Sequence, residues 1–538
     1  MTGMSPDDDP LAAARARVAA LRASLEVREG RPVRQIETHI SWVLLAQTLA
    51  YKLKKPLRLP FLDFTTLAAR RRYCEEELRL NRRLAPSLYL DVVDVCDSAA
   101  GPVFGGAGRA IDVAVRMRRF PDGALWSEML AAGILAPRHI DAMAQRLADF
   151  HRDAATAPPG SGFGSAAANE RTTRRLLDGI DAWHARAAAP GAAGAWPELR
   201  AWPELRAWLV GQLAALAPLW EARRRGGRVR EGHGDLHLAN VLQLGDEATA
   251  FDGIEFDDEL RWIDVLNDIA FLAMDLLAHG QRALAFRFLN AYLEASGDYD
   301  GLPALRFYLA GRALVRAQVA TIGEGQGVHS AARCGAADYL ALAAAVACSA
   351  DARLAITHGL PGSGKSFVSQ GVIEAAGAIR VRSDVERKRL FGLEALQSSR
   401  DRVPAGIYDS ATTARTYARL HEVARVALGA GWPVVVDAAF LRRSERVQFE
   451  ALADSLGVPF SILDCRAALP LLRKQLAQRQ ASGGDASEAD AAVLERLREV
   501  AEPLDERECS LAIVADAEHA VAPAALAQRW LKALKTRR

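Results

Sequence analysis

The spacing of hydrophobic and polar residues changes along the chain between a pattern typical of strands and one typical of helices. These changes predict where its strands and helices lie. Between residues 35 and 55 the apolar positions recur in short alternating runs, which is typical of strands. A helix is predicted over Leu67–Leu84, followed by strands over Leu88–Val95 and Ile111–Met117. From about residue 121 onward the pattern becomes helical. The first 30 residues or so, acidic and then rich in alanine and arginine, predict a frayed helix.

The pattern changes again near residue 350, where short apolar runs alternate with helical segments. The strands expected there are Arg353–His358, Ile379–Val381 and Pro433–Val436. A chain of 538 residues, half of them apolar, is long enough for two domains with separate cores. We therefore predict an N-terminal extension over residues 1–32, a first domain over 33–345 and a second over 350–538.

Composition excludes several classes of function. A net charge of +2 predicts neither general nucleic-acid binding nor a polybasic membrane tail. No apolar run has the length of a signal-peptide core or a membrane span, so we predict a cytoplasmic protein without a membrane partner. The six cysteines show neither CxxC nor metal-ligand spacing and are expected to be reduced thiols.

The stretch from residue 231 to 255 carries the residues of a phosphoryl-transfer centre. His233-Gly234-Asp235-Leu236 is followed by Asn240, and Asp252 ends the second strand of a short hairpin. In such a centre Asp235 accepts the proton of an attacking hydroxyl, because a carboxylate can act as a base. Asn240 and Asp252 supply the oxygen ligands that Mg²⁺ prefers.

The pattern HGDLHxxN followed by a strand-borne aspartate resembles the aminoglycoside phosphotransferase family, which shares the two-lobed protein-kinase fold. The resemblance implies an N-lobe over residues 33–120, a C-lobe over 121–345 and a hinge at residues 118–121. It also implies that Lys52 reaches the nucleotide phosphates, with Lys54 on the same strand face as the alternative. Glu77 is expected to pair with this lysine, and Glu75 and Glu76 remain alternatives.

Three further expectations follow from the same resemblance. No glycine lies between Gln35 and Lys52, so the phosphate cover is expected at the turn of residues 39–41 rather than in a Gly-rich loop. His151 is expected to pack beneath the catalytic loop. Asp264 and Asp268 are expected to brace that loop.

A second nucleotide motif begins directly after the strand that ends at His358. It is a complete GxxxxGK[ST] sequence, made of Gly359, Leu360, Pro361, Gly362, Ser363, Gly364, Lys365 and Ser366. The glycines let backbone N–H groups point at phosphate oxygens, Lys365 bridges the terminal phosphates and Ser366 ligates Mg²⁺. The strand before the motif and the helix after it supply the required context.

The segments after this loop predict a kinase rather than a motor. Asp384 and Asp437 each follow a strand, where Asp384 can bind or deprotonate an acceptor hydroxyl and Asp437 can hold the magnesium shell. Arg473 and Arg479 precede residues 481–487, which are expected to form a lid. Residues 350–538 resemble the small P-loop kinases grouped with AAA domains.

The predicted fold class is mixed: an α+β two-lobed kinase-like fold joined to an α/β P-loop domain with a parallel sheet. The predicted function is a bifunctional phosphotransferase that uses ATP and Mg²⁺ and acts on hydroxyl groups of small molecules, aminoglycoside-like or metabolic. Two alternatives stay open. One half can be a nucleotide-binding regulator of the other, or the P-loop half can phosphorylate nucleic-acid ends. The sequence does not predict the oligomeric state.

Overall fold

The computed structural model describes most of the chain. The described residues are 9–59, 62–187, 201–325, 334–349, 351–399, 407–482, 486–517 and 521–533. They form two compact units. Unit 1 comprises Met1–Ala142, Phe150–Ala168 and Arg223–Asp268, and unit 2 comprises Met143–Asp149, Asn169–Ala222 and Ile269–Arg538. Among the described residues, no helix has both the length and the apolar character needed to cross a bilayer.

Unit 1 is built on an antiparallel sheet in the order β1-β2-β3-β8-β6-β7. Its strands are β1 (Arg34–Glu37), β2 (Ser41–Leu45), β3 (Leu49–Lys54), β6 (Tyr89–Cys96), β7 (Val103–Phe104) and β8 (Ala110–Arg118). The strands expected from the alternating pattern are therefore confirmed to within a residue or two. Along β3, Tyr51 and Leu53 face one side of the sheet while Ala50 faces the other. This alternation places Lys52 and Lys54 on the Ala50 side.

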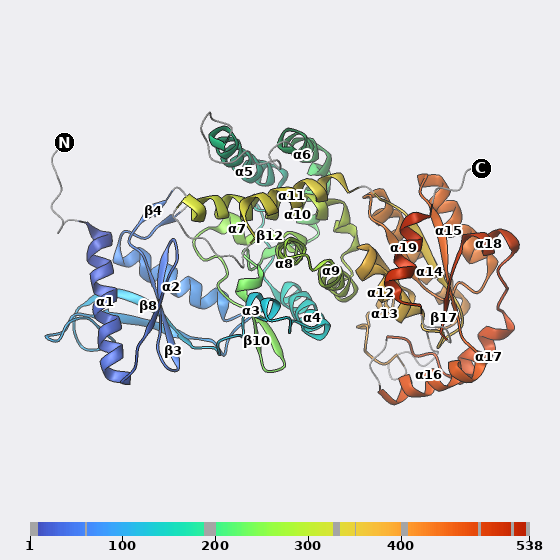
Figure 1. The fold of residues 1–538 in the computed structure, drawn as a ribbon, viewed down its shortest axis with the longest axis horizontal. Helices are drawn as coiled ribbons and strands as arrows, with labels where there is room; N and C mark the ends of the chain where they lie inside the picture. The colour runs from blue at the N-terminus through green and yellow to red at the C-terminus, as the bar shows by residue number, and fades with distance from the viewer. Residues whose placement is uncertain are drawn as a thin grey trace. The chain divides into compact units, whose positions relative to one another are not determined.

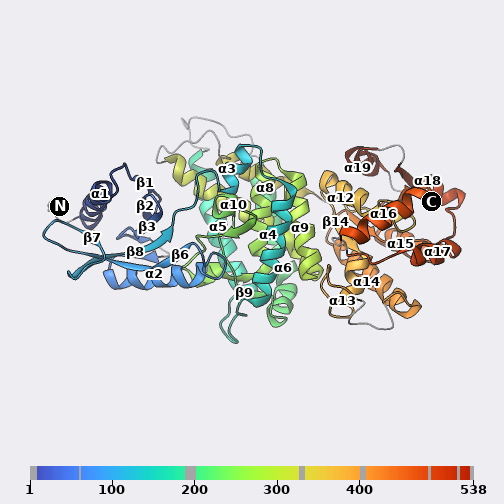
Figure 2. The same ribbon diagram turned by 90° about the horizontal axis from the view of Figure 1, so that it is seen from below.

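Helix α1 (Pro10–Glu29) covers the Tyr51 and Leu53 face of this sheet (Figures 1 and 2). It confirms the helix predicted near the N-terminus, but these residues are well packed rather than frayed. The Asp9 side chain caps its first turn by accepting from Leu11 N at 2.9 Å. Its buried residues Ala14, Val18, Leu21 and Leu25 recur every three or four positions and pack with Trp42 and Leu53. This stripe is therefore part of the core of the sheet in unit 1.

Helix α2 (Leu67–Asn81) covers the opposite face, with Cys74 packed against Ala50, Val113 and Val115. Thr66 begins the helix by accepting from Ala69 N at 3.1 Å. The rest of unit 1 contains the short elements around the catalytic loop. They are α3 (Trp126–Ala131), β9 (Val229–Glu231), η3 (Leu238–Asn240), β10 (Val241–Leu244), β11 (Glu247–Ala250), α7 (Asp258–Arg261) and β12 (Trp262–Asp264). Strands β10 and β11 form the predicted hairpin, and β9 pairs with β12.

Unit 2 contains long helices and a parallel sheet. The helices before the sheet that lie wholly in unit 2 are α9 (Arg282–Ser296), α10 (Leu302–Gly325) and α11 (Ala336–Cys348). Four more have residues in both units: α4 (Pro137–Asp153), α5 (Ala166–Ala187), α6 (Trp202–Arg225) and α8 (Val265–Ala278). Their buried faces are almost wholly apolar, with Phe271, Leu289 and Tyr308 among the enclosed side chains. These helices confirm the helical pattern expected after residue 121.

The sheet of unit 2 has the order β14-β15-β13-β16-β17, and all neighbouring strands are parallel. Its strands are β13 (Leu354–His358), β14 (Ile379–Arg382), β15 (Val434–Asp437), β16 (Phe460–Arg466) and β17 (Ala512–Asp516). Helices α12 (Lys365–Ala376) and α19 (Pro523–Lys532) cover one face, and α14 (Ser410–Gly429) and α15 (Arg443–Leu456) contact the other (Figure 1). The predicted P-loop fold is confirmed.

The edge strand β14 is covered by α9, a helix from the segment before the P-loop domain. Asn290 donates its Nδ2 to the Ala378 oxygen at 2.8 Å and accepts from Arg380 N at 2.6 Å. Tyr299 donates to the Arg380 oxygen at 3.3 Å. These bonds occupy backbone groups that an open sheet edge would otherwise expose. Helix α9 therefore covers the β14 edge of the P-loop domain's sheet.

Candidate active sites

The kinase-like site begins with a buried lysine–glutamate pair. Lys52 on β3 places its Nζ 2.9 Å from Glu77 Oε1 on α2, and it also pairs with Asp252. Burial acts to lower the pKa of Lys52, but attraction to Asp252 and Glu77 outweighs it and holds that pKa well above the ordinary value. The amine is therefore kept charged beside a carboxylate at the end of the catalytic hairpin.

Lys54, the alternative phosphate-binding lysine, lies deeper on the same face of β3. Its Nζ is 2.7 Å from Glu77 Oε2 and also pairs with Glu255. Burial raises the pKa of Glu77, but the two lysines more than reverse this effect and lower the pKa to about 2. Glu77 thus forms ion pairs with both lysines. Of the two, Lys52 is the one that also pairs with Asp252.

Asp235 lies on the catalytic loop between β9 and η3, with its side chain 35 % exposed. Asn240 donates its Nδ2 to the Asp235 backbone oxygen at 2.9 Å and to Asp235 Oδ2 at 3.1 Å. His237 Nε2 lies 3.4 Å from the same Oδ2. Gly234 adopts φ +84°, and a Cβ there would lie 2.8 Å from the Leu260 oxygen. The loop therefore fixes one oxygen of an accessible carboxylate and requires glycine beside it.

Asp268 anchors this loop from below. Its carboxylate accepts from the backbone N–H of His233 at 2.7 Å and from that of the following glycine at 2.9 Å, and His151 Nε2 lies 3.1 Å away. Burial disfavours the charge, but hydrogen bonding and attraction to His151 lower the pKa of Asp268 well below its usual range. Asp264 was expected to share this role, but it pairs with Arg223 at 2.7 Å instead.

Asp252 has a left-handed backbone conformation, with φ +63°. Such a conformation is uncommon for a residue with a side chain and persists where the surroundings hold it. Its N–H donates to the Tyr89 hydroxyl at 3.1 Å, and the next N–H, that of Gly253, donates to Asn81 Oδ1 at 2.8 Å. Asn81 in turn donates to the Glu77 backbone oxygen at 2.9 Å. The turn that presents the Asp252 carboxylate is therefore tied to α2.

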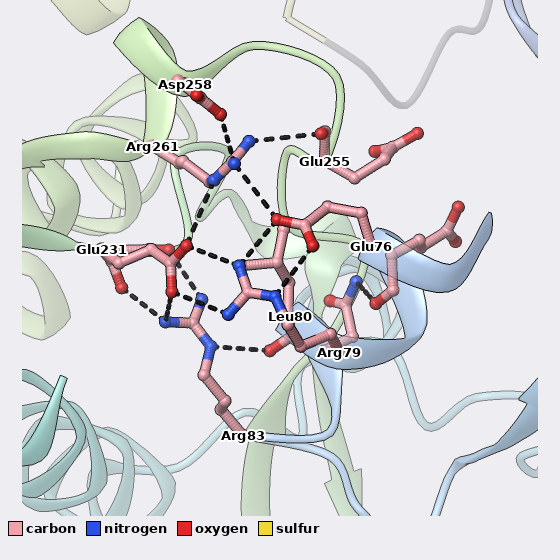
Figure 3. Close-up of polar contacts among 11 residues, drawn as sticks. Glu76, Arg79, Leu80, Arg83, Glu231, Glu255, Asp258 and Arg261 are labelled. Carbon is pink, nitrogen blue, oxygen red and sulfur yellow. Dashed lines mark hydrogen bonds and ion pairs between the residues drawn. The ribbon is translucent and has the colours of Figure 1, made fainter. Parts of the chain in front are cut away.

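An ion-pair cluster around Glu231 joins α2 to the catalytic loop (Figure 3). Glu231 lies 2.6 Å from Arg79 Nη2, 3.1 Å from Arg83 Nη1 and 3.4 Å from Arg261 Nε. Arg261 also pairs with Glu76 at 3.1 Å. Burial opposes its charge, but the arginines lower the pKa of Glu231. The cluster fixes the helix that carries Glu77 to the strand that leads into Asp235, and sequence reasoning did not find it.

The second site is the loop between β13 and α12. Gly359, Gly362 and Gly364 have φ values of +143°, +82° and +83°. A Cβ at Gly359 would lie 2.5 Å from a backbone oxygen of β16, so the close turn requires glycine there. Lys365 folds back to donate to the Leu360 oxygen at 2.9 Å, and the buried Ser363 Oγ has no hydrogen-bond partner within the described structure. An enclosed hydroxyl and a lysine at a helix N-terminus fit a phosphate group.

Carboxylates gather beside this loop. Asp437 ends β15 and accepts from Ser369 Oγ at 3.0 Å, while Arg382 Nε lies 3.8 Å from the same Oδ2. Burial lowers the pKa of Lys365, and attraction to Asp437 partly offsets this effect. Together with the Ser366 hydroxyl, Asp437 supplies a set of hard oxygen donors that fits Mg²⁺.

A carboxylate from α9 also reaches this region, which sequence reasoning missed. Glu294 Oε1 lies 2.7 Å from Arg380 Nη2, and Oε2 lies 3.7 Å from Arg382 Nη1. Arg380 in turn donates to Ser369 Oγ at 3.3 Å. Glu294 thus orients both arginines that border the Asp437 carboxylate. Glu294 precedes Arg380 by 86 residues in the sequence, so only the folded structure reveals that their side chains meet.

The remaining predicted residues of the second site differ in their exposure and in their partners. Asp384 lies in the first turn of α13 (Ser383–Arg389), and its charge and that of Arg479 both act on the Lys365 amine. Arg479 donates to a backbone oxygen ten residues further along the chain at 2.9 Å. Arg473 is instead 58 % exposed and pairs with Glu495 at 2.7 Å. Of the predicted lid, residues 483–485 lie outside the described residues.

Parts of the chain are similar to known proteins. A family model described as an AAA domain matches residues 354–504. A crystal structure of a choline/ethanolamine kinase family protein from Mesorhizobium loti is 14 % identical, with a TM-score of 0.36, and covers 62 % of this chain and 94 % of that one. A putative kinase from Chloroflexus aurantiacus is 19 % identical, with a TM-score of 0.28, and covers 34 % and 99 %.

The predicted AAA-type P-loop domain is confirmed by the family model over residues 354–504. Much closer in sequence is the uncharacterized protein Rv2004c of Mycobacterium tuberculosis, which is 31 % identical over 458 residues. The match spans 85 % of this chain and 88 % of the relative, so it includes both the kinase-like segment and the P-loop segment. The chain therefore belongs to the same protein family as Rv2004c.

Proposed function

We propose that the protein is a bifunctional ATP-dependent phosphotransferase. Each half would transfer the ATP γ-phosphoryl group to a hydroxyl of a small molecule, with Mg²⁺ as the metal. The observation that carries the proposal is the presence of two separate constellations, each combining a phosphate-type lysine, carboxylate ligands and a candidate base. Positioning and electrostatics account for most of the catalysis of phosphoryl transfer, so these groups are the ones such an enzyme needs.

In the kinase-like half, Asp235 is proposed to accept the proton of the acceptor hydroxyl. Its accessible side chain and its bond from Asn240, which orients the carboxylate, support this role. Asn240 and Asp252 would hold magnesium, and Lys52 would bind the phosphates. Glu77 would keep Lys52 charged and in place.

In the P-loop half, residues 359–366 are proposed to hold the phosphates through backbone N–H groups and the Lys365 amine. Ser366 and Asp437 would hold magnesium, and Asp384 would bind or deprotonate the acceptor. Arg479 is proposed to assist at the transferring group and Arg473 to contact the nucleotide when the segment that carries it closes. Ser369 donates a hydrogen bond to the Asp437 carboxylate, and Arg382 forms an ion pair with it. Both contacts hold the carboxylate in place, which supports its role as a metal ligand.

Magnesium-dependent ATP consumption with a panel of hydroxylated acceptors tests this proposal. We expect Asp235→Asn to lose one group of acceptors and Lys365→Ala to lose another, because each change affects a different half. If the wild type consumed no ATP with any acceptor while still binding the nucleotide, the proposal would be abandoned. If only Lys365→Ala lost turnover, the kinase-like half would be a binding or regulatory module.

One observation favours that second candidate, a nucleotide sensor in the kinase-like half. The turn at residues 39–41, where the phosphate cover is expected, is held by Lys55. Its Nζ donates to the oxygen of the preceding Thr38 at 2.5 Å, and its N–H donates to the Ile40 oxygen at 2.8 Å. A fixed cover suits binding more than rapid exchange of nucleotide. In this candidate, Lys52→Met removes the ATP-dependent activation of P-loop chemistry. Unchanged P-loop kinetics in that variant would exclude it.

A further inference from the structure

A pocket of about 220 Å³ lies in unit 2, where α9 and α10 meet the P-loop domain. Its walls are largely apolar and include Phe286, Leu309 and Trp432. Two arginines, Arg282 and Arg306, also line it. None of the residues of the two proposed transfer sites is among its lining residues, so the pocket is a separate feature of the molecule.

Each arginine is held at the carboxyl end of a helix. Arg282 donates its Nη2 to the Ala376 oxygen at 2.6 Å, where α12 ends. Arg306 donates its Nη2 to the Gly431 oxygen at 2.5 Å, just after α14. Helix C-termini carry partial negative charge, which explains why guanidinium groups lie there. Each bond uses one of five donors, so both groups keep donors for another ligand.

No carboxylate within the described structure pairs with either guanidinium. Asp351 also lines the pocket, but it pairs with Arg353 at 2.5 Å. The Arg306 Nε is enclosed and has no hydrogen-bond partner among the described atoms. Burial lowers the pKa of Arg282, and it lowers that of Arg306 to about 10. Positive charge is therefore concentrated in a partly dry pocket in which no described carboxylate pairs with either guanidinium group.

Neighbouring arginines show that this arrangement is specific to the pocket. Arg287, one turn along α9 from Arg282, pairs with Glu374 at 2.8 Å. Arg380 pairs with Glu294 of α9 at 2.7 Å. These two arginines beside α9 thus pair with carboxylates. The two arginines of the pocket instead keep hydrogen-bond donors that can contact solvent or a ligand.

We propose that this pocket binds a small phosphate-bearing anion, either inorganic phosphate or a phosphate monoester. Guanidinium groups are planar and match the oxygens of a phosphate in paired hydrogen bonds. The apolar walls formed by Phe286, Leu309 and Trp432 would hold the organic part of a monoester. Trp432 lies directly under Arg306, with the guanidinium 4.6 Å from the ring centre, so the ring and the anion would contact the same side chain.

Isothermal titration calorimetry of the full chain with inorganic phosphate and with phenyl phosphate tests the site. Arg306→Met removes the charge but keeps most of the apolar stem, and Arg287→Met is the matched control with the same charge change. Phosphate bound at the nucleotide sites is common to all three proteins and cancels in the comparison. We expect binding at this pocket to weaken at least tenfold in Arg306→Met and to remain unchanged in Arg287→Met.

Equal phosphate affinities in the wild type and in Arg306→Met would overturn the proposal. If Arg306→Met fails to fold, Arg282→Met provides the same test from the other side of the pocket. Tighter binding of phenyl phosphate than of inorganic phosphate would identify a monoester as the ligand class, and equal binding would identify free phosphate. No phosphoryl transfer is measured, so failure of this site and failure of the proposed enzymatic function are distinguishable.

Discussion

The kinase-like site and the P-loop site bring charge to a phosphate in opposite ways. In the first, side chains from elements about 200 residues apart meet: Lys52 contacts both Glu77 and Asp252. In the second, eight consecutive residues form the loop, and three of its glycines adopt conformations that favour glycine. The first site therefore depends on long-range ion pairs, and the second depends mainly on local backbone geometry.

This difference has consequences for robustness. A buried ion pair is costly to break from one side, because the remaining charge loses its partner in a dry environment. A backbone loop has no such dependence on a remote residue, but it cannot accept a side chain where φ is positive. We therefore expect the kinase-like site to be weakened by substitution of charged residues far away in the sequence and by low pH. The P-loop site should be weakened mainly by substitutions within its own eight residues.

The largest expected effect comes from removing the candidate base of the kinase-like half. We expect Asp235→Asn to reduce kcat for that half's acceptors by about 10²–10⁴-fold, the usual contribution of general base catalysis, with little change in nucleotide affinity. Initial rates measured at saturating ATP check this. Asp246→Asn, in the exposed hairpin turn, is the control and should keep wild-type rates. A wild-type rate in Asp235→Asn would remove Asp235 from the proposed chemistry.

The second effect is on stability. Glu231→Gln removes the carboxylate that three arginines share, while Glu76 still pairs with Arg79 and Arg261. Because Arg79 is half exposed, we expect the free energy of unfolding to fall by about 1.5–3 kcal/mol, the usual range for hydrogen bonds to charged groups. Urea unfolding of the full chain measures it. Glu75→Gln on the exposed face of α2 is the matched control. A loss in Glu231→Gln no larger than in the control would show that the cluster does not hold α2.

The third effect concerns acid. Because the pKa of Glu77 falls from 4.5 to about 2 in the folded state, its charge stabilises the protein fully above about pH 4.5. This contribution should shrink as pH falls from 4.5 toward 2, since the unfolded state takes up the proton first. We expect the difference in unfolding free energy between the wild type and Glu77→Gln to decrease across this window. A constant difference from pH 6 to pH 2.5 would contradict the assignment.

The smallest effect belongs to the P-loop site. Ser369→Ala removes the hydroxyl that donates to Asp437, which should cost about 1 kcal/mol and weaken Mg·ATP binding about fivefold. Equilibrium binding of the nucleotide checks it, with Ser455→Ala on α15 as the control. A loss of several hundredfold would mean that this site, too, depends on remote side chains.

Much of the fold was predictable because its signals are local. The P-loop lies in one contiguous strand–loop–helix segment, and the catalytic loop carries its residues within twenty positions. The Glu231 cluster was not predictable, since Glu231 and Arg79 are 152 residues apart and each alone looks like a solvated charge. Glu294 was missed for the same reason. The N-terminal helix was predicted, but its packing on the sheet was not, although the apolar spacing from Ala14 to Leu25 carried that signal.

The central claim is that one chain holds two independent nucleotide sites. Equilibrium binding of a non-hydrolysable ATP analogue with magnesium, with the stoichiometry determined directly, tests it most simply. The account predicts two sites per chain in the wild type, one in Lys52→Met, one in Lys365→Ala and none in the double variant. A single site in the wild type that disappears in Lys365→Ala and persists unchanged in Lys52→Met would contradict it.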